Sequence, residues 1–184
     1  REGAKLSSRM SLQWCFTGNS AMGKGTVARI IARLYKAMGI IPSEKVLDFK
    51  VERMIGMVEE EAQRCIGEAL AKSNSGILLF DEDSPKLSDA SGFRERVRVI
   101  LMNQMAERPG AHIIIYAEPR NRVAGLNGDA EHVSELVNVL TFEDYSKEEL
   151  MVILRRRLGK ENMKLTTTAR QHMAGFIGSL VATE

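Results

Sequence analysis

The stretch FTGNSAMGKGTVARIIARLY, Phe16 to Tyr35, decides the fold class. It contains the spacing G-x-x-x-x-G-K, in which loop amides and a helix N-terminus surround phosphate oxygens while the lysine neutralises their charge. The flanks agree with this interpretation, because the apolar run from Leu12 to Gly18 predicts a strand and the residues from Gly25 to Met38 predict a helix. The candidate phosphate-binding residues are Gly18, Asn19, Ser20, Ala21, Met22, Gly23, Lys24, Gly25 and Thr26.

The remaining chain alternates short apolar runs with longer amphipathic ones, which favours a parallel sheet covered by helices. Nothing after Thr141 resembles a strand, and two amphipathic helices are expected there. We therefore predict an α/β core over residues 1–144, with a five-stranded parallel sheet flanked by helices, and a partial helical lid, cut short, over residues 145–184. Besides the first strand, the expected strands are 45–50, 77–80, 112–117 and 137–141, and the expected helices between them include 51–72 and 93–105.

Composition limits the classes of function. The chain has 184 residues, of which 44% are hydrophobic and 27% charged, so a packed core is expected and global disorder is not. The net charge of +2 argues against a nucleic-acid binder that relies on bulk charge. No apolar run reaches the length of a membrane span, and no signal peptide is visible. Cys15 and Cys65 are interpreted as reduced, buried thiols of a cytoplasmic protein.

A second motif, ILLFDE, follows the expected strand 77–80. In P-loop hydrolases an aspartate at the end of such a strand holds Mg²⁺, so Asp81 is the candidate metal ligand. Glu82 is then placed to orient or deprotonate the attacking water as a general base. The motif therefore predicts hydrolytic chemistry beside the phosphate loop.

Together these segments resemble an AAA+ ATPase of the CbxX/CfqX family, which includes the red-type Rubisco activase and the AAA+ domain of type VII secretion ATPases. FTGNSAMGKGTVAR resembles the family's F-T-G-N-P-G-T-G-K-T-T-V-A-R, and GILLFDE resembles G-V-L-F-I-D-E. LTFEDYSKEELMVIL resembles I-x-F-P-D-Y-S-x-E-E-L-x-x-I-L, the most diagnostic of the matches. The resemblance runs in order from Phe16 to Leu154. It implies a Rossmann-like P-loop fold that binds ATP and Mg²⁺.

The chain also departs from this family. Gly25 stands where a hydroxyl-bearing residue normally ligates Mg²⁺. The phosphate loops of nucleoside-monophosphate kinases, however, also contain the sequence GKGT. Glu135 falls on the position of the arginine finger, for which Arg120 or Arg122 could substitute. Met54 or Ile55 occupies the place of the pore-loop aromatic residue, with core-facing helix residues as the alternative interpretation. These departures predict weak or lost hydrolysis.

We therefore expect an ATP-binding domain that works in a hexameric ring or a tandem assembly and remodels a protein partner, without nucleic acid or membrane. Lys24 would steady the outer phosphates, Asp81 and Thr26 would manage Mg²⁺, and Glu82 would activate water. A fully active remodelling ATPase is one alternative. A small-molecule phosphotransferase is the other, and the pair Asp81 and Glu82 argues against it, since a water-activating carboxylate promotes wasteful hydrolysis. Arg94, Arg96 and Arg98 are interpreted as helix-surface charge rather than a subunit interface.

Overall fold

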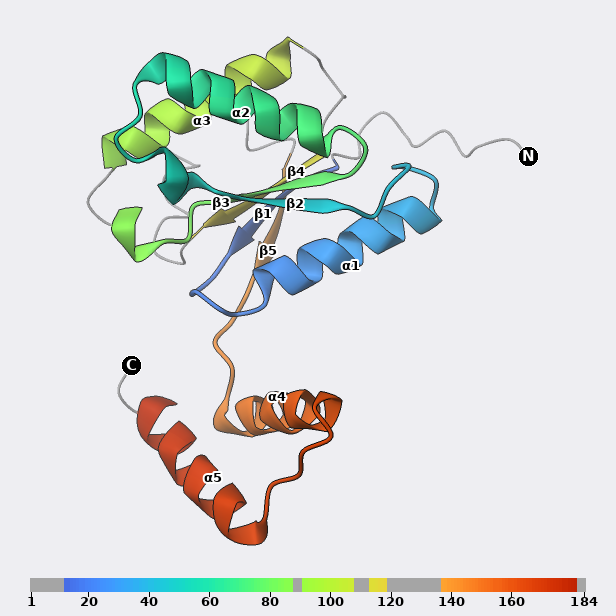
Figure 1. The fold of residues 1–184 in the computed structure, drawn as a ribbon, viewed down its shortest axis with the longest axis vertical. Helices are drawn as coiled ribbons and strands as arrows, with labels where there is room; N and C mark the ends of the chain where they lie inside the picture. The colour runs from blue at the N-terminus through green and yellow to red at the C-terminus, as the bar shows by residue number, and fades with distance from the viewer. Residues whose placement is uncertain (1–11, 88–90, 108–112, 119–136, 182–184) are drawn as a thin grey trace. The chain divides into compact units, whose positions relative to one another are not determined.

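The chain divides into two compact units, residues 1–142 and 143–184. The computed structural model describes residues 12–87, 91–107, 113–118 and 137–181 (Figure 1). Among these described residues, the first unit carries the sheet and three long helices, and the second carries two helices. Each unit is considered by itself.

The first unit is built on a five-stranded sheet in the order β2-β3-β4-β1-β5. Every pair of neighbouring strands is parallel, so all five carboxyl ends meet at one edge. The predicted five-stranded parallel sheet is thus confirmed. The strands are β1 (Gln13–Thr17), β2 (Val46–Lys50), β3 (Ile77–Asp81), β4 (Ile113–Glu118) and β5 (Val137–Thr141).

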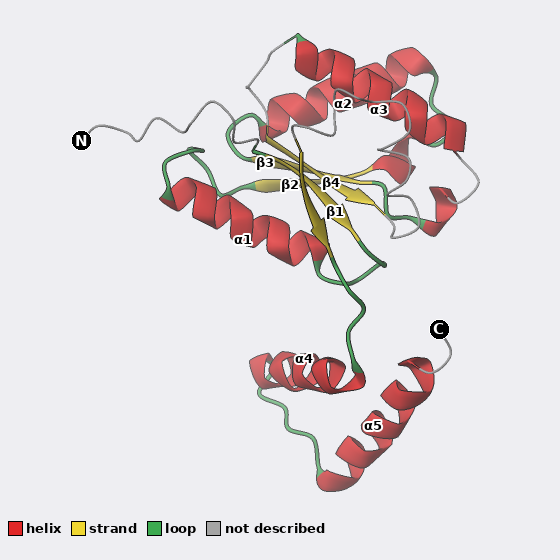
Figure 2. Ribbon diagram, turned by 180° about the vertical axis from the view of Figure 1, so that it is seen from behind, coloured by secondary structure: helices red, strands yellow, loops and turns green. Residues whose placement is uncertain are grey.

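Helices cover both faces of this sheet. Helix α1 (Lys24–Ala37) lies on one face, and α2 (Glu59–Ser73) and α3 (Ser91–Ala106) lie together on the other, as both ribbon views show (Figures 1 and 2). Two short 3₁₀ helices, η1 (Val51–Met54) and η2 (Pro85–Leu87), follow β2 and β3. The sheet is therefore buried on both sides, which explains why β3 and β4 are continuous apolar runs.

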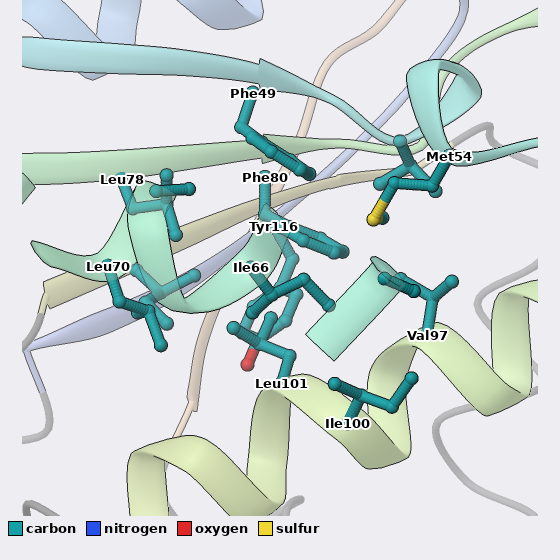
Figure 3. Packing of buried hydrophobic residues seen from close by; sticks show 14 of the residues in the cluster. Phe49, Met54, Ile66, Leu70, Leu78, Phe80, Val97, Ile100, Leu101 and Tyr116 are labelled. Atoms are coloured by element: carbon teal, nitrogen blue, oxygen red, sulfur yellow. The ribbon is translucent and has the colours of Figure 1, made fainter. Parts of the chain in front are cut away.

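Successive side chains along each strand enter different cores, because strand side chains alternate between the two faces. In β3, Leu78 and Phe80 belong to the core under α2 and α3, whereas Ile77 and Leu79 belong to the core under α1. Phe80 stacks on Phe49 of β2 with ring centroids 5.6 Å apart (Figure 3). This alternation also decides where the polar residues that follow β3 point.

The prediction of a single helix over residues 51–72 is wrong in one respect. The segment is two elements, the 3₁₀ helix η1 and then α2, separated by a turn in which Gly56 has a φ of +84°. The apolar periodicity ran through the break because Met54 is fully buried in the same core as the helix that follows. Met54 is thus core-facing, as the alternative interpretation held, while Ile55 is 47% exposed.

The second unit contains α4 (Lys147–Lys160) and α5 (Thr167–Val181), both of which the periodicity predicted. The capping box at the start of α4 is present: the Glu149 amide donates to Ser146 Oγ at 3.3 Å, and the Ser146 amide donates to Glu149 Oε2 at 2.9 Å. No helix within the described ranges is both long and apolar enough to span a bilayer.

Candidate phosphate-binding site

The loop between β1 and α1 has a backbone that suits glycine at three places. Gly18 has a φ of +148°, and a Cβ there would lie 2.6 Å from the carbonyl oxygen of Phe142, so any side chain would collide with backbone. Gly23 has a φ of +94° and Ala21 a φ of +65°. Ala21 therefore holds a left-handed conformation that L-residues adopt only at a cost. The loop keeps this shape although its sequence lacks one of the usual glycines.

The loop ends at the positive end of a long helix. Helix α1 starts at Lys24 without a side chain that caps its first amides. The Gly23 carbonyl accepts from the amides of Thr26 and Val27 at 2.9 and 3.1 Å, which fixes the first turn. A helix N-terminus that no side chain caps, preceded by a glycine-rich loop, presents amides and a positive dipole end to an anion.

Lys24 folds back over this loop. Its Nζ donates to the carbonyl oxygens of Gly18 and Asn19 at 2.7 and 2.8 Å, and to Asp83 Oδ2 at 2.7 Å. Lys24 is only 7% exposed. All three protons of the ammonium group are thus directed at protein oxygens, one of which carries a full negative charge. A phosphate that contacts Lys24 must replace at least the Asp83 carboxylate.

Asp81 ends β3 beside the last residue of β2. The two strands place Lys50 and Asp81 directly opposite each other, and Lys50 Nζ donates to Asp81 Oδ2. The other oxygen, Oδ1, accepts from the amide of Asp83 at 2.9 Å. The hydrogen bond to Asp81 raises the pKa of Lys50 despite some loss of solvation. Asp81 is therefore neutralised by a neighbour that is itself half exposed.

Glu82 is bound in a different way, because it is fully buried. Arg98 of α3 grips it with two donors: Nε reaches Oε1 at 2.9 Å and Nη2 reaches Oε2 at 2.7 Å. The same Nη2 also donates to Glu118 Oε1, at the end of β4, at 2.8 Å. Burial alone would lower the pKa of Arg98, but the hydrogen bonding to Glu82 and the charges of Glu82 and Glu118 raise it overall. One guanidinium thus serves two buried carboxylates.

The alternation of the strand explains this division. Phe80 faces α2 and α3, so Asp81 faces the α1 side, where the phosphate loop lies, and Glu82 faces α3 again. Asp83 returns to the α1 side and meets Lys24. Three consecutive carboxylates therefore take three different cations from three elements, and only two of them lie on the side of the loop.

The structure thus brings some of the predicted site residues together and separates another. Asp81 accepts from the amide of Asp83, and the Asp83 carboxylate in turn accepts from Lys24 of the phosphate loop. Glu82 stands at the expected strand end, but its carboxylate points to α3. Thr26 is exposed in the first turn of α1. A Cβ on Gly25 would lie 3.3 Å from Arg29 Nη1, the tip of a flexible side chain, so a hydroxyl-bearing residue would fit there.

The interpretation of the α3 arginines as surface charge is wrong for two of the three. Arg94 is 4% exposed and donates from Nε to the Leu87 carbonyl at 3.2 Å, and Arg98 holds the two glutamates. Arg96 is exposed, as expected. A helical projection contained the signal, because residues 94 and 98 share the stripe that continues at Leu101. No motif marked two further partners: Lys50, which binds Asp81, and Glu118, which accepts from Arg98.

Three residues on which the sequence argument relied, Glu135, Arg120 and Arg122, lie outside the described residues.

The described residues fit phosphate better than they fit a metal. The glycine backbone, the start of α1 and Lys24 form a cradle for an anion. For Mg²⁺ the chain offers the Asp81 carboxylate, and in the described part of the chain no group of three or more His, Cys, Asp or Glu side chains gathers around one point. A metal here would take most of its ligands from phosphate and water, as Mg²⁺ does when it accompanies a nucleotide.

Solved structures share this arrangement. Domain III of the replication initiation protein DnaA from Thermotoga maritima superposes with a TM-score of 0.60 over 91% of this chain and 70% of its own, at 18% identity. The AAA domain of FIGL-1 in complex with ADP gives a TM-score of 0.58 over 90% of this chain and 54% of its own, at 12% identity. The chain has the AAA+ fold.

Curated proteins extend the AAA+ likeness to sequence. Stage V sporulation protein K of Bacillus subtilis is 24% identical over 99% of this chain and 57% of its own length. CbbX of Cereibacter sphaeroides is 24% identical over 91% of the chain and 55% of its own length. A Rubisco activase of Cyanidioschyzon merolae is 28% identical over 82% of this chain and 52% of its own length.

These relatives are AAA+ ATPases, and they confirm the resemblance to the CbbX and CfxQ group that the motifs indicated. No protein-family model matches the chain. The chain spans little more than half the length of the relatives named above.

Proposed function

We propose that this AAA+ domain binds ATP at the loop from Gly18 to Thr26 and acts in a hexameric ring or a tandem assembly that remodels a protein partner. The observation that carries the proposal is the cradle itself: a loop whose backbone suits glycine, a start of α1 without a side-chain cap, and Lys24 paired with Asp83. The similarity to ADP- and AMPPCP-bound neighbours supports ATP as the ligand. A reducing compartment such as the cytoplasm would suit the two free cysteines, Cys15 and Cys65.

We further propose that hydrolysis by this domain is weak or lost. Gly25 offers no hydroxyl to Mg²⁺, which leaves Asp81 and Thr26 as the metal ligands that the chain supplies. Glu82, the candidate base, is buried and bound at both oxygens, so the activation of water depends on its release. Lys24 would stabilise charge on the outer phosphates once Asp83 is displaced. Regulation by bound nucleotide, rather than turnover, is the activity that these contacts favour. The residues 145–184, proposed as part of a helical lid, would add to the site in a larger assembly.

Calorimetry with ATP, with and without Mg²⁺, combined with a phosphate-release assay on the full-length protein, tests this function. We expect binding with little turnover, and loss of binding in Lys24→Ala. Absence of binding in the folded wild-type protein would reduce the domain to a scaffold. Turnover at rates of 1 s⁻¹ or more, of the order usual for enzymes, that disappears in Glu82→Gln would instead support the fully active alternative.

The role of Gly25 has its own matched pair of variants. Gly25→Ser and Gly25→Ala both add a Cβ, for which Arg29 can move aside, but only serine adds a hydroxyl. We expect Mg²⁺ to increase ATP affinity more in Gly25→Ser than in Gly25→Ala, which serves as the control. Equal responses of the two variants to Mg²⁺ would show that the missing hydroxyl does not limit metal binding.

A further inference from the structure

Lys50 ends β2 at the edge of the sheet where the phosphate loop lies. Strands β2 and β3 are parallel, and their register sets Lys50 directly opposite Asp81. Phe49 belongs to the core under α2 and α3, so the next residue, Lys50, faces the α1 side, where the loop lies. The side chain of Lys50 is 47% exposed and that of Asp81 is 11% exposed. A half-exposed ammonium group thus covers a nearly buried carboxylate.

Both oxygens of the Asp81 carboxylate already accept hydrogen bonds. Lys50 Nζ donates to Oδ2, and the amide of Asp83 donates to Oδ1 at 2.9 Å. The Asp83 carboxylate in turn accepts from Lys24 of the phosphate loop at 2.7 Å. Hydrogen bonds through the two aspartates therefore connect Lys50 to the lysine that would contact phosphate.

A magnesium ion at Asp81 would have to lie beside the ammonium group of Lys50. A carboxylate has spare lone pairs, so hydrogen bonds alone do not exclude a metal. The obstacle is charge, because a divalent cation and an ammonium group on one nearly buried carboxylate repel each other. The loop does not compensate for this repulsion, since Gly25 has no hydroxyl and Thr26 is exposed in the first turn of α1. A metal held by Asp81 and this loop therefore fits the described residues poorly.

The same ammonium group suits the phosphate chain of a nucleotide. A lysine ammonium group has three protons, and one of those on Lys50 is directed at Asp81. The others can be donated to phosphate oxygens in hydrogen bonds of the strong, charge-assisted kind. The flexible stem of lysine lets its exposed end adjust to a ligand. Lys50 can therefore neutralise phosphate charge that Mg²⁺ neutralises in other nucleotide sites.

We propose that Lys50 determines which form of the nucleotide the site binds: its ammonium group takes the place of Mg²⁺ at Asp81, so that the loop binds metal-free ATP. This inference rests on the proposed function, since it specifies the ligand of the same loop. An ammonium group neutralises charge but does not act as the Lewis acid that polarises a phosphoryl group. The consequence is nucleotide binding with little turnover.

Lys50→Met removes the ammonium group and keeps a long, unbranched side chain. Lys45→Met is the matched control, because it removes the same charge from an exposed residue just before β2, at the opposite end of that strand. Lys50→Met/Gly25→Ser frees Asp81 and also adds the hydroxyl that the loop lacks. Circular dichroism and thermal melting confirm that each variant of the full-length protein is folded.

The first readout is the dissociation constant of ATP, measured by calorimetry in excess EDTA and in excess Mg²⁺. We expect the wild-type protein and Lys45→Met to bind ATP in EDTA at least as tightly as in Mg²⁺. Lys50→Met should bind metal-free ATP about tenfold more weakly, the loss expected for one charge-assisted hydrogen bond. Mg²⁺ should recover this affinity in Lys50→Met, and more fully in Lys50→Met/Gly25→Ser.

The two conditions separate a failure of this inference from a failure of the proposed function. Binding by the wild-type protein that requires Mg²⁺ would overturn the role of Lys50 and leave the loop as an ATP site. Equal binding of metal-free ATP by the wild-type protein and by folded Lys50→Met would also overturn it. Absence of binding in both conditions would refute the proposed function, and this inference with it.

A second readout uses the wild-type protein alone, so it decides the question even if Lys50→Met does not fold. Acetic anhydride acetylates accessible lysines, and peptide mass spectrometry reports the extent of labelling at each one. We expect ATP in excess EDTA to reduce the labelling of Lys50 several-fold and to leave that of Lys45 unchanged. Unchanged labelling of Lys50 while metal-free ATP is bound would show that its ammonium group does not contact phosphate, and the proposal would be wrong.

Discussion

The two faces of the sheet edge use the same kinds of ion pair in opposite ways. On the α1 side, Asp81 pairs with Lys50 and Asp83 pairs with Lys24. The side chain of Lys50 is 47% exposed and that of Asp83 is 12% exposed, against 1% for Glu82. On the α3 side, Glu82 is buried and forms an ion pair with Arg98. Exchange of a partner for a ligand is easy where water can replace the lost contact and costly where it cannot. The ion pairs on the α1 side are therefore more readily exchanged for a ligand than the pair between Glu82 and Arg98 on the α3 side.

The largest expected difference between the faces is in stability. Arg98→Met removes the guanidinium that holds the buried Glu82 carboxylate at both oxygens, and we expect the free energy of unfolding to fall by about 3–5 kcal/mol. Lys50→Met removes a half-exposed partner, for which we expect about 1 kcal/mol or less. Urea unfolding at pH 7 measures both. Similar losses for the two variants would mean that burial does not distinguish the faces.

The second-largest expected effect is a loss of stability at alkaline pH, which arises from a buried thiol on the α3 side of the sheet. Burial, and then the charge of Glu118, raises the pKa of the Cys15 thiol from 9.0 to about 12. Below pH 9 the thiol is protonated in both states; between pH 9 and 12 only the unfolded state releases the proton, so the free energy of unfolding falls as pH rises, by at most about 1.4 kcal/mol per pH unit.

Urea unfolding at pH 8 and pH 10.5 tests the contribution of this thiol. Cys15→Ala creates a small cavity and lowers stability at both pH values, so the informative quantity is the change between them. That change should be smaller in Cys15→Ala by about 1–2 kcal/mol, in line with the linkage relation. Tyr116, whose pKa is raised by burial and by Glu82, acts in the same direction in both proteins and cancels. An identical change in the two proteins would contradict the prediction.

On the binding face, Asp83→Asn should free Lys24 for phosphate. We expect the dissociation constant of an ATP analogue to fall about three- to tenfold, because a partly buried ion pair no longer competes; this corresponds to about 1 kcal/mol. Asp48→Asn removes an exposed carboxylate from β2 and serves as the control for charge alone. Fluorescence titration measures both. Equal effects of the two substitutions would identify general electrostatics rather than competition at Lys24.

The smallest effect concerns the loop itself. Ala21→Gly removes a left-handed alanine and should raise the free energy of unfolding by about 0.5–1 kcal/mol. The same substitution at Ala37, in the last turn of α1, should lower it by a similar amount, because glycine disfavours helix. Denaturant midpoints report both changes. Destabilisation by Ala21→Gly would show that the loop does not hold residue 21 against its preference.

Much of the fold was open to prediction because its signals are local. Each apolar run became a strand, and the capping box at Ser146 marked the start of α4. The helix break at Gly56 was missed because the buried Met54 continued the apolar period across a turn. Periodicity records which side of the chain is buried, and a 3₁₀ turn followed by a helix can bury the same side.

Part of the candidate site was predictable because its signals are also local, and part was not. Lys24 and Asp81 follow motifs whose spacing reflects a strand, a turn and a helix that are adjacent in sequence. Arg98 and Glu118 come from elements 16 and 36 residues away from Glu82 (98 − 82 and 118 − 82). No local rule states that a helix arginine will meet a strand end, so their pairing could not be read from spacing.

The sequence by itself determined that strand ends carrying Asp81, Glu82 and Asp83 meet a glycine-rich loop carrying Lys24, because parallel strands bring their carboxyl ends to one edge. Only the tertiary structure decided which carboxylate faces the loop. The alternation of β3 turns Glu82 toward α3, and the packing of α3 puts Arg98 there to receive it. A buried charge requires a partner, and that requirement sets the position of Glu82 more firmly than the motif to which it belongs.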